Sequence, residues 1–263
     1  MRNHWLKIFF FVLAWGLVCS SANALTLDEF DPPKNAKVGI FMGTFDPPHK
    51  SHHEVMEAAL AAGELDYVIV IPNDTPLHKP NAYSTEVRLQ MLKSLYADHA
   101  RIVTPHKTDF GGSMRLEIID NLRKTRPDIK LTGIYGTDIL QDNLKNKFAR
   151  KSFEKRFDAM FVTTNRPGVE GEKPEKFWGL PTTYATYKDV GTSSTRIRNY
   201  LKENPEFLKS ALSEEQALKV ANELGIDPRT LHDIHRLRLY SAPEPRSCQW
   251  FWSALGKVLE PKK

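Results

Sequence analysis

The sequence is poor in cysteine and contains neither an internal repeat nor a low-complexity tract. Only 2 of its 263 residues are cysteine, which excludes a small secreted scaffold held together by many disulfides. No similarity recurs at the spacing of about 20–50 residues that marks solenoids and propellers. The composition, 41% hydrophobic and 26% charged, is that of a globular protein with one large domain, or one domain and an appendage.

Basic residues are only slightly in excess of acidic ones. The formal net charge is +5, and the isoelectric point is near 9.0. This mild basicity is compatible with anionic ligands but does not by itself indicate a nucleic-acid partner, and we expect none.

The first 24 residues have the features of a secretory signal. Arg2 and Lys7 provide a positive amino-terminal region, residues 8–18 form an uncharged apolar run, and Ala22-Asn23-Ala24 fits the small-x-small cleavage pattern. The apolar run is shorter than the roughly 20 residues of a membrane span. We therefore expect cleavage near Ala24 and a secreted or periplasmic protein. An uncleaved signal anchor that tethers the chain to a membrane is the alternative.

Removal of this segment would change the charge and the cysteine count. It would leave 35 basic against 32 acidic residues, a net charge of +3, and a single cysteine, Cys248. No internal disulfide would then be possible. A lipoprotein signal that ends at Cys19 is disfavoured because the bulky Val18 precedes it.

After a lead-in over residues 25–37, short apolar runs alternate with segments of helical periodicity. Strands are expected at residues 37–42, 65–71, 101–103, 129–135, 158–163 and 181–187, and helices at 52–62, 84–98, 113–124 and 213–224. In the last of these helices Ser213 and Gln216 form a capping box, and Gly225 ends the helix. The alternation predicts an α/β fold, a doubly wound, Rossmann-like parallel sheet with helices on both faces. We expect a main domain over residues 25–204 and a small helical extension over residues 205–263. Because such sheets bind ligands at the carboxyl ends of their strands, functional residues are expected in the loops after the strands.

The loop after the first expected strand reads GTFDPPHKSHH over residues 43–53. Gly43 allows close backbone approach, and the helix that begins here offers free N–H groups to an anion. His49 and His52 are three residues apart, so on one helical turn both imidazoles point the same way and can bind phosphate oxygens. A zinc site at His49, His52 and His53 is the alternative, although no cysteine and no suitably spaced acidic residue lie nearby.

A second group of residues suited to phosphate follows about 150 residues later, in GTSSTRIR over residues 191–198. Its hydroxyl groups can cap the next helix, whose N–H groups and dipole favour an anion. Arg198 adds a planar guanidinium group for phosphate oxygens. An ordinary capped helix with a solvated arginine would explain the same residues.

Two further loops carry weaker signals. Lys79 ends the proline-rich segment after the second strand, where it could supply a mobile cation for phosphates. Gly136, Thr137 and Asp138 lie where a later strand ends and a helix is expected, a position at which Asp138 could equally be an N-cap.

Taken together, these strings resemble the nucleotidyltransferase superfamily, and most closely its nicotinate/nicotinamide mononucleotide adenylyltransferases. Residues 43–53 are similar to the signature G-T-F-D-P-x-H-x-G-H, with Ser51 replacing the glycine between the histidines. Residues 192–198 are similar to I-S-S-T-x-I-R, with Thr192 replacing isoleucine, and favour adenylyl over cytidylyl transfer. His78-Lys79 match the end of P-P-H-K, and residues 86–91 resemble E-x-R-x-x-M. The resemblance covers roughly residues 36–204.

The resemblance implies transfer of AMP from ATP to nicotinate or nicotinamide mononucleotide, giving the NAD-type dinucleotide and pyrophosphate. The residues it implies for ATP binding are Gly43, His49, His52, Ser193, Ser194, Thr195 and Arg198. Of these, His49, His52 and Arg198 would be catalytic. The mononucleotide would be bound by Thr44, Phe45, Lys79, Gly136, Asp138 and Phe148. Phe148 is the nearest aromatic substitute for a family tryptophan that residues 139–157 lack. Mg²⁺ would be bound mainly by the ATP phosphates, with no metal site of the protein's own.

Two other functions remain open from the sequence. ATP is expected to be scarce outside the cytoplasm, so a secreted chain could be a catalytically silent nucleotide-binding or interaction module. It could also be a nucleotidyltransferase with another phosphate acceptor. The basic, aromatic stretch that contains Trp250, Phe251 and Trp252 is suited to contact a membrane or a protein partner. A helix packed on the main domain is the alternative, and the pattern leaves the oligomeric state open.

The histidine pair gives a first testable prediction. We expect His52→Ala to lower turnover about 100-fold or more, as does the loss of other donors that stabilise charge in a transition state. Steady-state kinetics with ATP and the mononucleotide measures this effect. An unchanged rate would remove His52 from the mechanism.

Overall fold

The structure is a computed structural model. It describes residues 25–73, 79, 81–106, 114–137, 147–164, 173, 175–187, 191–208 and 213–240. The expected signal segment, Asp138 and the stretch with Trp250, Phe251 and Trp252 lie outside these residues. No helix within the described ranges is long and apolar enough to cross a membrane.

A seven-stranded sheet forms the centre of the molecule, in the order β3-β2-β1-β4-β5-β7-β6. Its strands are β1 (Lys37–Gly43), β2 (Tyr67–Pro72), β3 (Ile102–Val103), β4 (Lys130–Gly136), β5 (Ala159–Thr163), β6 (Lys176–Phe177) and β7 (Leu180–Ala185). All neighbouring pairs are parallel except β6 and β7, which pair antiparallel. The six expected strands are present with ends shifted by one or two residues. The two-residue β6 was not predicted, because so short a strand carries no periodic signal.

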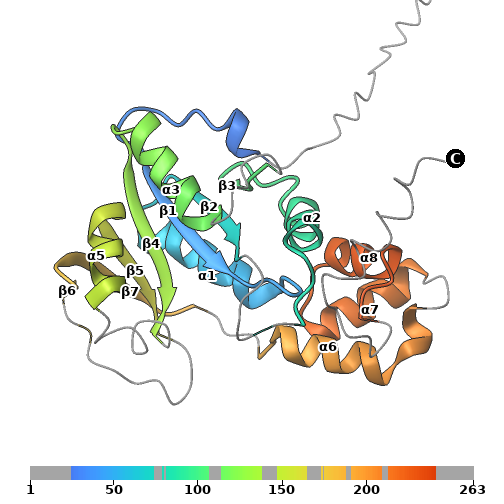
Figure 1. Cartoon of the computed structure of the whole chain (residues 1–263). Helices are drawn as coiled ribbons and strands as arrows, with labels where there is room; N and C mark the ends of the chain where they lie inside the picture. Colours follow the sequence, from blue (N-terminus) through green and yellow to red (C-terminus); the bar gives the residue numbers. More distant parts are fainter. Residues whose placement is uncertain are drawn as a thin grey trace, which may run out of the picture.

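Helices cover both faces of this sheet, as Figure 1 shows. On one face, α1 (Lys50–Ala62) and α2 (Thr85–Leu95) share an apolar layer with β1 and β2 that includes Val55, Met56 and Leu92. On the other face, α3 (Met114–Thr125) and α5 (Lys147–Arg156) pack through Ile118, Ile119 and Phe153. The predicted doubly wound, Rossmann-like fold is therefore confirmed.

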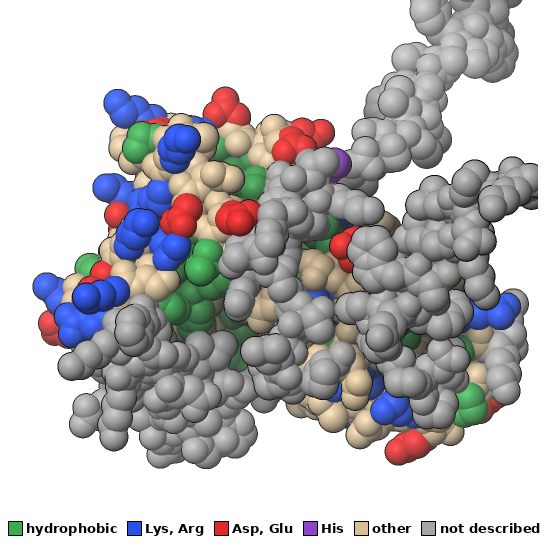
Figure 2. All heavy atoms as spheres, in the orientation of Figure 1, with side chains coloured by type: hydrophobic (Ala, Val, Ile, Leu, Met, Phe, Trp, Pro, Cys, Tyr) green, Lys and Arg blue, Asp and Glu red, His purple; other side chains and the backbone are tan. Residues whose placement is uncertain are grey.

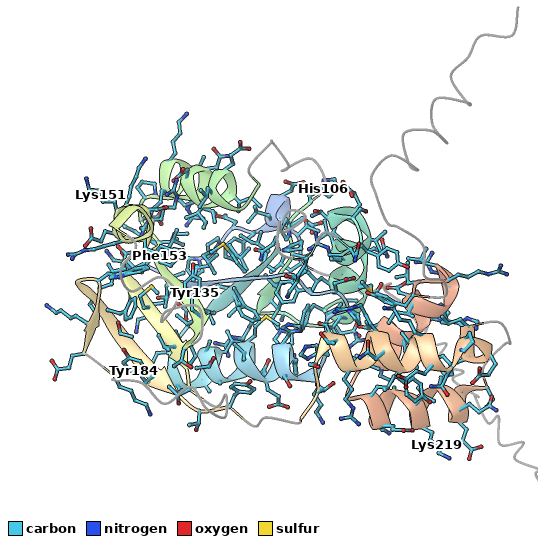
Figure 3. All side chains as sticks on the ribbon, turned by 60° about the horizontal axis from the view of Figure 1, so that its bottom comes forward. His106, Tyr135, Lys151, Phe153, Tyr184 and Lys219 are labelled. Carbon is cyan, nitrogen blue, oxygen red and sulfur yellow. The ribbon has the colours of Figure 1, made fainter. Side chains whose placement is uncertain are left out.

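The sequence pattern did not predict α5, because its residues are mostly charged. Phe153 anchors it to the sheet, with ring centroids 5.1 Å from Tyr135 and 4.9 Å from Trp178, and Figure 3 shows Tyr135 and Phe153 close together. Lysine and arginine side chains gather on the outer side of α3 and α5 in Figure 2. Several of them are paired, including Arg156 with Asp120 at 2.7 Å.

A third, smaller core lies at the carboxyl-terminal end of the described chain. It joins α6 (Ser194–Glu203), the short η3 (Pro205–Leu208), α7 (Glu214–Leu224) and α8 (Pro228–Arg236). The predicted capping box is present, since Ser213 and Gln216 exchange hydrogen bonds of 3.0 and 3.2 Å, and Gly225 ends α7. Met91 of α2 lies in the same core. The terminal helices therefore pack directly on α2 and α6.

The strand order reverses between β1 and β4, which are neighbours in the sheet. The chain leaves β1 toward β2 on one side, whereas β4 leads to β5 on the other. The loops that follow β1 and β4 therefore diverge above the carboxyl edge of the sheet, where open α/β sheets bind their ligands. Gly43 and Gly136 stand at the ends of these two strands.

Gly225 connects the third core to this edge. Its φ of 63° is left-handed, and a Cβ there would lie 2.9 Å from the Thr192 Cβ. Its carbonyl accepts a hydrogen bond of 2.9 Å from the Lys50 N–H at the start of α1. The turn that ends α7 thus contacts the beginnings of both α1 and α6.

We predict that Gly225→Ala destabilises the fold more than Gly191→Ala. Gly191 has almost the same φ, 64°, but a Cβ there would meet nothing within 4 Å. The control should show only the backbone cost, about 1–2 kcal/mol, and Gly225→Ala should add the clash with Thr192. Urea unfolding measures both. Equal losses would mean that the contact with Thr192 contributes nothing.

Candidate active site

The loop after β1, residues 43–49, is called the motif loop below. Phe45 has a φ of 51°, and its side chain is buried. A Cβ on Gly43 would lie 2.8 Å from the Phe45 ring, so glycine is required by this close approach. The ring packs edge-on against Phe41 and His52, with centroids 5.5 and 4.8 Å away. The Phe45 side chain thus braces the loop, and only its backbone is placed to meet a ligand.

The structure brings His49 and His52 together. His49 is the N-cap of α1, and its N–H donates to Nδ1 of His52 at 3.2 Å. The ring centroids are 3.8 Å apart at an interplanar angle of 33°. His49 is buried and His52 half-buried. The three-residue spacing therefore produces a compact imidazole pair at the beginning of α1.

The beginning of α6 docks directly on the motif loop. Ser194 donates its hydroxyl to the Pro47 carbonyl at 2.9 Å, across 147 residues of sequence. Arg198 donates from Nη1 to the Asp46 carbonyl at 2.6 Å and from Nη2 to the Thr195 hydroxyl at 3.1 Å. Figure 3 shows α1 and α6 beside each other. The two expected phosphate-binding segments thus form one site.

The N–H groups at these helix starts are partly used within the protein. Ser193 caps α6 by accepting from the Arg196 N–H at 3.2 Å. At α1, the Lys50 N–H is bonded to Gly225, so it is not available to an anion as the sequence suggested. The expectation of phosphate binding therefore rests on the histidine side chains at α1 and on Arg198 at α6.

The other predicted residues are placed less completely. Lys79 donates from Nζ to the Thr44 hydroxyl at 3.3 Å, which puts it at the motif loop. Gly136 lies at the carboxyl end of β4, paired with Thr163. Phe148 lies in α5, where its side chain is outside the described part of the structure, as is all of Asp138. Their predicted contacts with a mononucleotide remain predictions.

Three residues at the site were not assigned a role from the sequence. Arg88 is fully buried and donates to the Thr44 carbonyl at 2.7 Å and to the Tyr83 carbonyl at 2.7 Å. Asp46, within the motif loop, is buried, and its carboxylate accepts a 2.6 Å hydrogen bond from Tyr240. Arg88 could have been suspected, because a lone arginine occupies a helical position among apolar residues. Tyr240 carried no such signal.

The described residues do not favour a zinc site. Within the described ranges, no three histidine, cysteine or acidic side chains are arranged to hold a metal ion. His53 points instead to Glu57, at 4.0 Å, and burial lowers its pKa. Ser51, at the family's glycine position, is buried in the first turn of α1. The helix therefore forms with a serine at this position.

A cavity of about 410 Å³ lies beside His49, between α1, the end of α2 and the turn before α8. Its walls include His53, Tyr96 and Arg229 but no residue of α6. His49 thus lines this cavity, whereas His52 and Arg198 do not. Burial raises the pKa of Tyr96, so this phenol stays protonated.

Comparison with known proteins agrees with this geometry. The family model described as cytidylyltransferase-like matches residues 40–200. A probable nicotinate-nucleotide adenylyltransferase of Geobacillus thermodenitrificans is 35% identical over 221 residues, which cover 78% of this chain and 96% of that protein. The nicotinate-nucleotide adenylyltransferase of Bacillus subtilis is 29% identical over 178 residues, which cover 63% of this chain and 86% of that protein.

Solved structures show the same fold at lower identity. The nicotinic acid mononucleotide adenylyltransferase of Plasmodium falciparum complexed with APC superposes with a TM-score of 0.55 at 14% identity. The match covers 78% of this chain and 98% of that chain. The same enzyme complexed with NaAD also gives a TM-score of 0.55, at 15% identity.

The junction between α6 and the motif loop predicts how the site binds a polyanion. Arg198→Lys should weaken the binding of inorganic tripolyphosphate about 10-fold, or about 1.4 kcal/mol, because lysine cannot bridge two oxygens. Arg196→Lys is the matched control: Arg196 is exposed and bonds the carbonyls of Gly191 and Glu223. Titration calorimetry measures both affinities. An unchanged affinity in Arg198→Lys would show that the positive charge alone matters, and equal losses in the two variants would show that the effect is not specific to Arg198.

Proposed function

The chain belongs to the cytidylyltransferase-like family, and we propose that it is a nicotinate-nucleotide adenylyltransferase. It transfers AMP from ATP to nicotinate mononucleotide, giving the NAD-type dinucleotide and pyrophosphate. The names of the curated relatives support this choice of substrates. The observation that carries the proposal is the docking of α6 on the motif loop, which joins the two phosphate-binding segments in one site.

The reaction needs no covalent bond to the protein. A phosphate oxygen of the mononucleotide forms a bond to the α-phosphorus of ATP. The bond from that phosphorus to the bridging oxygen breaks, and pyrophosphate leaves in line. The catalytic contribution is therefore positioning and stabilisation of charge. In this proposal His49, His52 and Arg198 hold the triphosphate on which the negative charge develops.

Two hydroxyl groups of α6 and two residues at the motif loop complete the proposed binding site. Ser194 and Thr195 lie at the beginning of α6 and face the triphosphate. Lys79 donates to the hydroxyl of Thr44 in the motif loop at 3.3 Å, and these two residues are proposed to meet the mononucleotide.

Magnesium enters the proposal as part of the substrate. Asp46, the acidic residue of the motif loop, is buried and bonded to Tyr240. It therefore does not project as a metal ligand. We propose that Mg²⁺ arrives with ATP, bound by phosphate oxygens and water, and that it neutralises phosphate charge.

A substrate panel tests the proposal on the chain from Leu25 onward. ATP and CTP are each combined with nicotinate mononucleotide, nicotinamide mononucleotide and glycerol 3-phosphate, and pyrophosphate release is measured. We expect release with ATP and nicotinate mononucleotide, at a kcat/KM at least about 10-fold above every other pair.

The other outcomes correspond to the remaining functions. Saturable binding of ATP without pyrophosphate release would identify a silent nucleotide-binding module. Release only with CTP, or only with another acceptor, would identify a different transferase. Either result would overturn the proposed function.

A further inference from the structure

Asp46 is a carboxylate buried under the motif loop, 3% exposed, between a phenylalanine and two prolines. A buried charge is costly unless it is hydrogen-bonded. Its Oδ1 accepts the hydroxyl of Tyr240 at 2.6 Å, across 194 residues of sequence. Tyr240 is itself fully buried. The last described residue of the chain thus reaches the centre of the motif loop.

The backbone of Asp46 holds the loop from a second direction. Its carbonyl accepts Nη1 of Arg198 at 2.6 Å. Asp46 therefore bonds Tyr240 through its carboxylate and Arg198 through its carbonyl. We expect a shift of Asp46 to move the guanidinium that is proposed to bind ATP phosphate.

Tyr240 is connected to the other side of the loop as well. Its N–H donates to the Tyr83 hydroxyl at 2.7 Å, and the two rings meet edge-on with centroids 4.8 Å apart. The Tyr83 carbonyl accepts Nε of Arg88, which in turn donates to the Thr44 carbonyl. These hydrogen bonds form a path that leaves the motif loop at Asp46 and returns to it at Thr44.

The conformation of Tyr240 shows that its position is imposed by its surroundings. Its φ of 67° is in the left-handed region, which is uncommon for residues other than glycine and above all for bulky ones. Such a conformation persists only where neighbouring contacts determine it. Here Leu239 and the Tyr240 ring belong to the third core, with α7 and α8.

From these contacts we propose that Tyr240 is a positioning residue for adenylyl transfer. It acts through Asp46 to hold the motif loop and Arg198 in the geometry that binds ATP. The helices after residue 204 would then have a catalytic purpose besides packing. This role rests on the proposed function. The restraint of the motif loop by the bond from Tyr240 to Asp46, called the clamp below, can be tested without it.

The substitution Tyr240→Phe removes the hydroxyl and keeps the ring. We expect kcat to fall about 10- to 100-fold, the range for a small misplacement of reacting groups, while KM for nicotinate mononucleotide changes less than about 2-fold. Amide exchange in a peptide covering residues 41–52 should become faster, and exchange in β4 should not change. Thermal unfolding of each variant ensures that rates are compared between folded proteins.

The matched control is Tyr200→Phe. Tyr200 packs on the same third core, and no hydrogen bond from its hydroxyl is found among the described residues. Neither turnover nor exchange in the motif loop should change in this variant. The double variant Tyr240→Phe/Asp46→Ala should be no slower than Asp46→Ala alone, because residues that act through one contact are not additive.

Each outcome decides a separate statement. If Tyr240→Phe changes neither exchange nor kcat, or changes exchange alone in an active enzyme, the positioning role is wrong. If the unmodified chain has no activity but Tyr240→Phe still speeds exchange in the loop, the clamp stands and the proposed function fails. Additive losses in the double variant would show that Tyr240 does not act through Asp46.

Discussion

The hydrogen bonds from α6 to two carbonyl groups of the motif loop are the interaction on which the site depends. Ser194 and Arg198 donate to Pro47 and Asp46, respectively. A loop with consecutive prolines lacks the N–H groups that would let it join a regular ladder, so its carbonyls need other donors. The beginning of α6 supplies them. Two helix beginnings that are remote in sequence are thereby joined in one site, which the proposed function assigns to the ATP phosphates.

The sheet and the third core make this contact possible in different ways. The sheet brings the loops after β1 and β4 to the edge where the strand order changes. It does not by itself determine where α6 lies, because α6 packs mainly with the terminal helices. Met91 of α2 belongs to that core, and the Gly225 carbonyl bonds the first turn of α1. The part of the candidate site contributed by α6 is therefore positioned by the terminal helices α7 and α8.

Two buried charged side chains, Arg88 of α2 and Asp46 of the motif loop, hold this loop in place. Arg88 donates to carbonyl groups and to the Thr85 hydroxyl, and Asp46 accepts from a phenol. A buried ionised group is tolerated when its hydrogen-bonding capacity is met, and it then specifies a single arrangement of its neighbours. These hydrogen bonds hold the loop at Thr44 and Asp46. Preorganised groups of this kind stabilise charge without reorganising during the reaction.

Local signals in the sequence determined much of this protein. The alternation of apolar runs and helical segments predicted the sheet and its two helical layers. The Ser213 and Gln216 pair with Gly225 predicted the ends of α7, and the spacing of His49 and His52 predicted their common direction. These features depend on residues a few positions apart, where backbone periodicity and capping chemistry act.

Only the tertiary structure decided which distant residues complete the site. The contacts of Thr44 with Arg88, of Pro47 with Ser194 and of Asp46 with Tyr240 span 44, 147 and 194 residues. A hydrogen bond over such a separation depends on how whole helices pack, and no local pattern encodes its partner. No local pattern marks Tyr240. The third core places its hydroxyl against Asp46, and burial, not residue type, makes that contact obligatory.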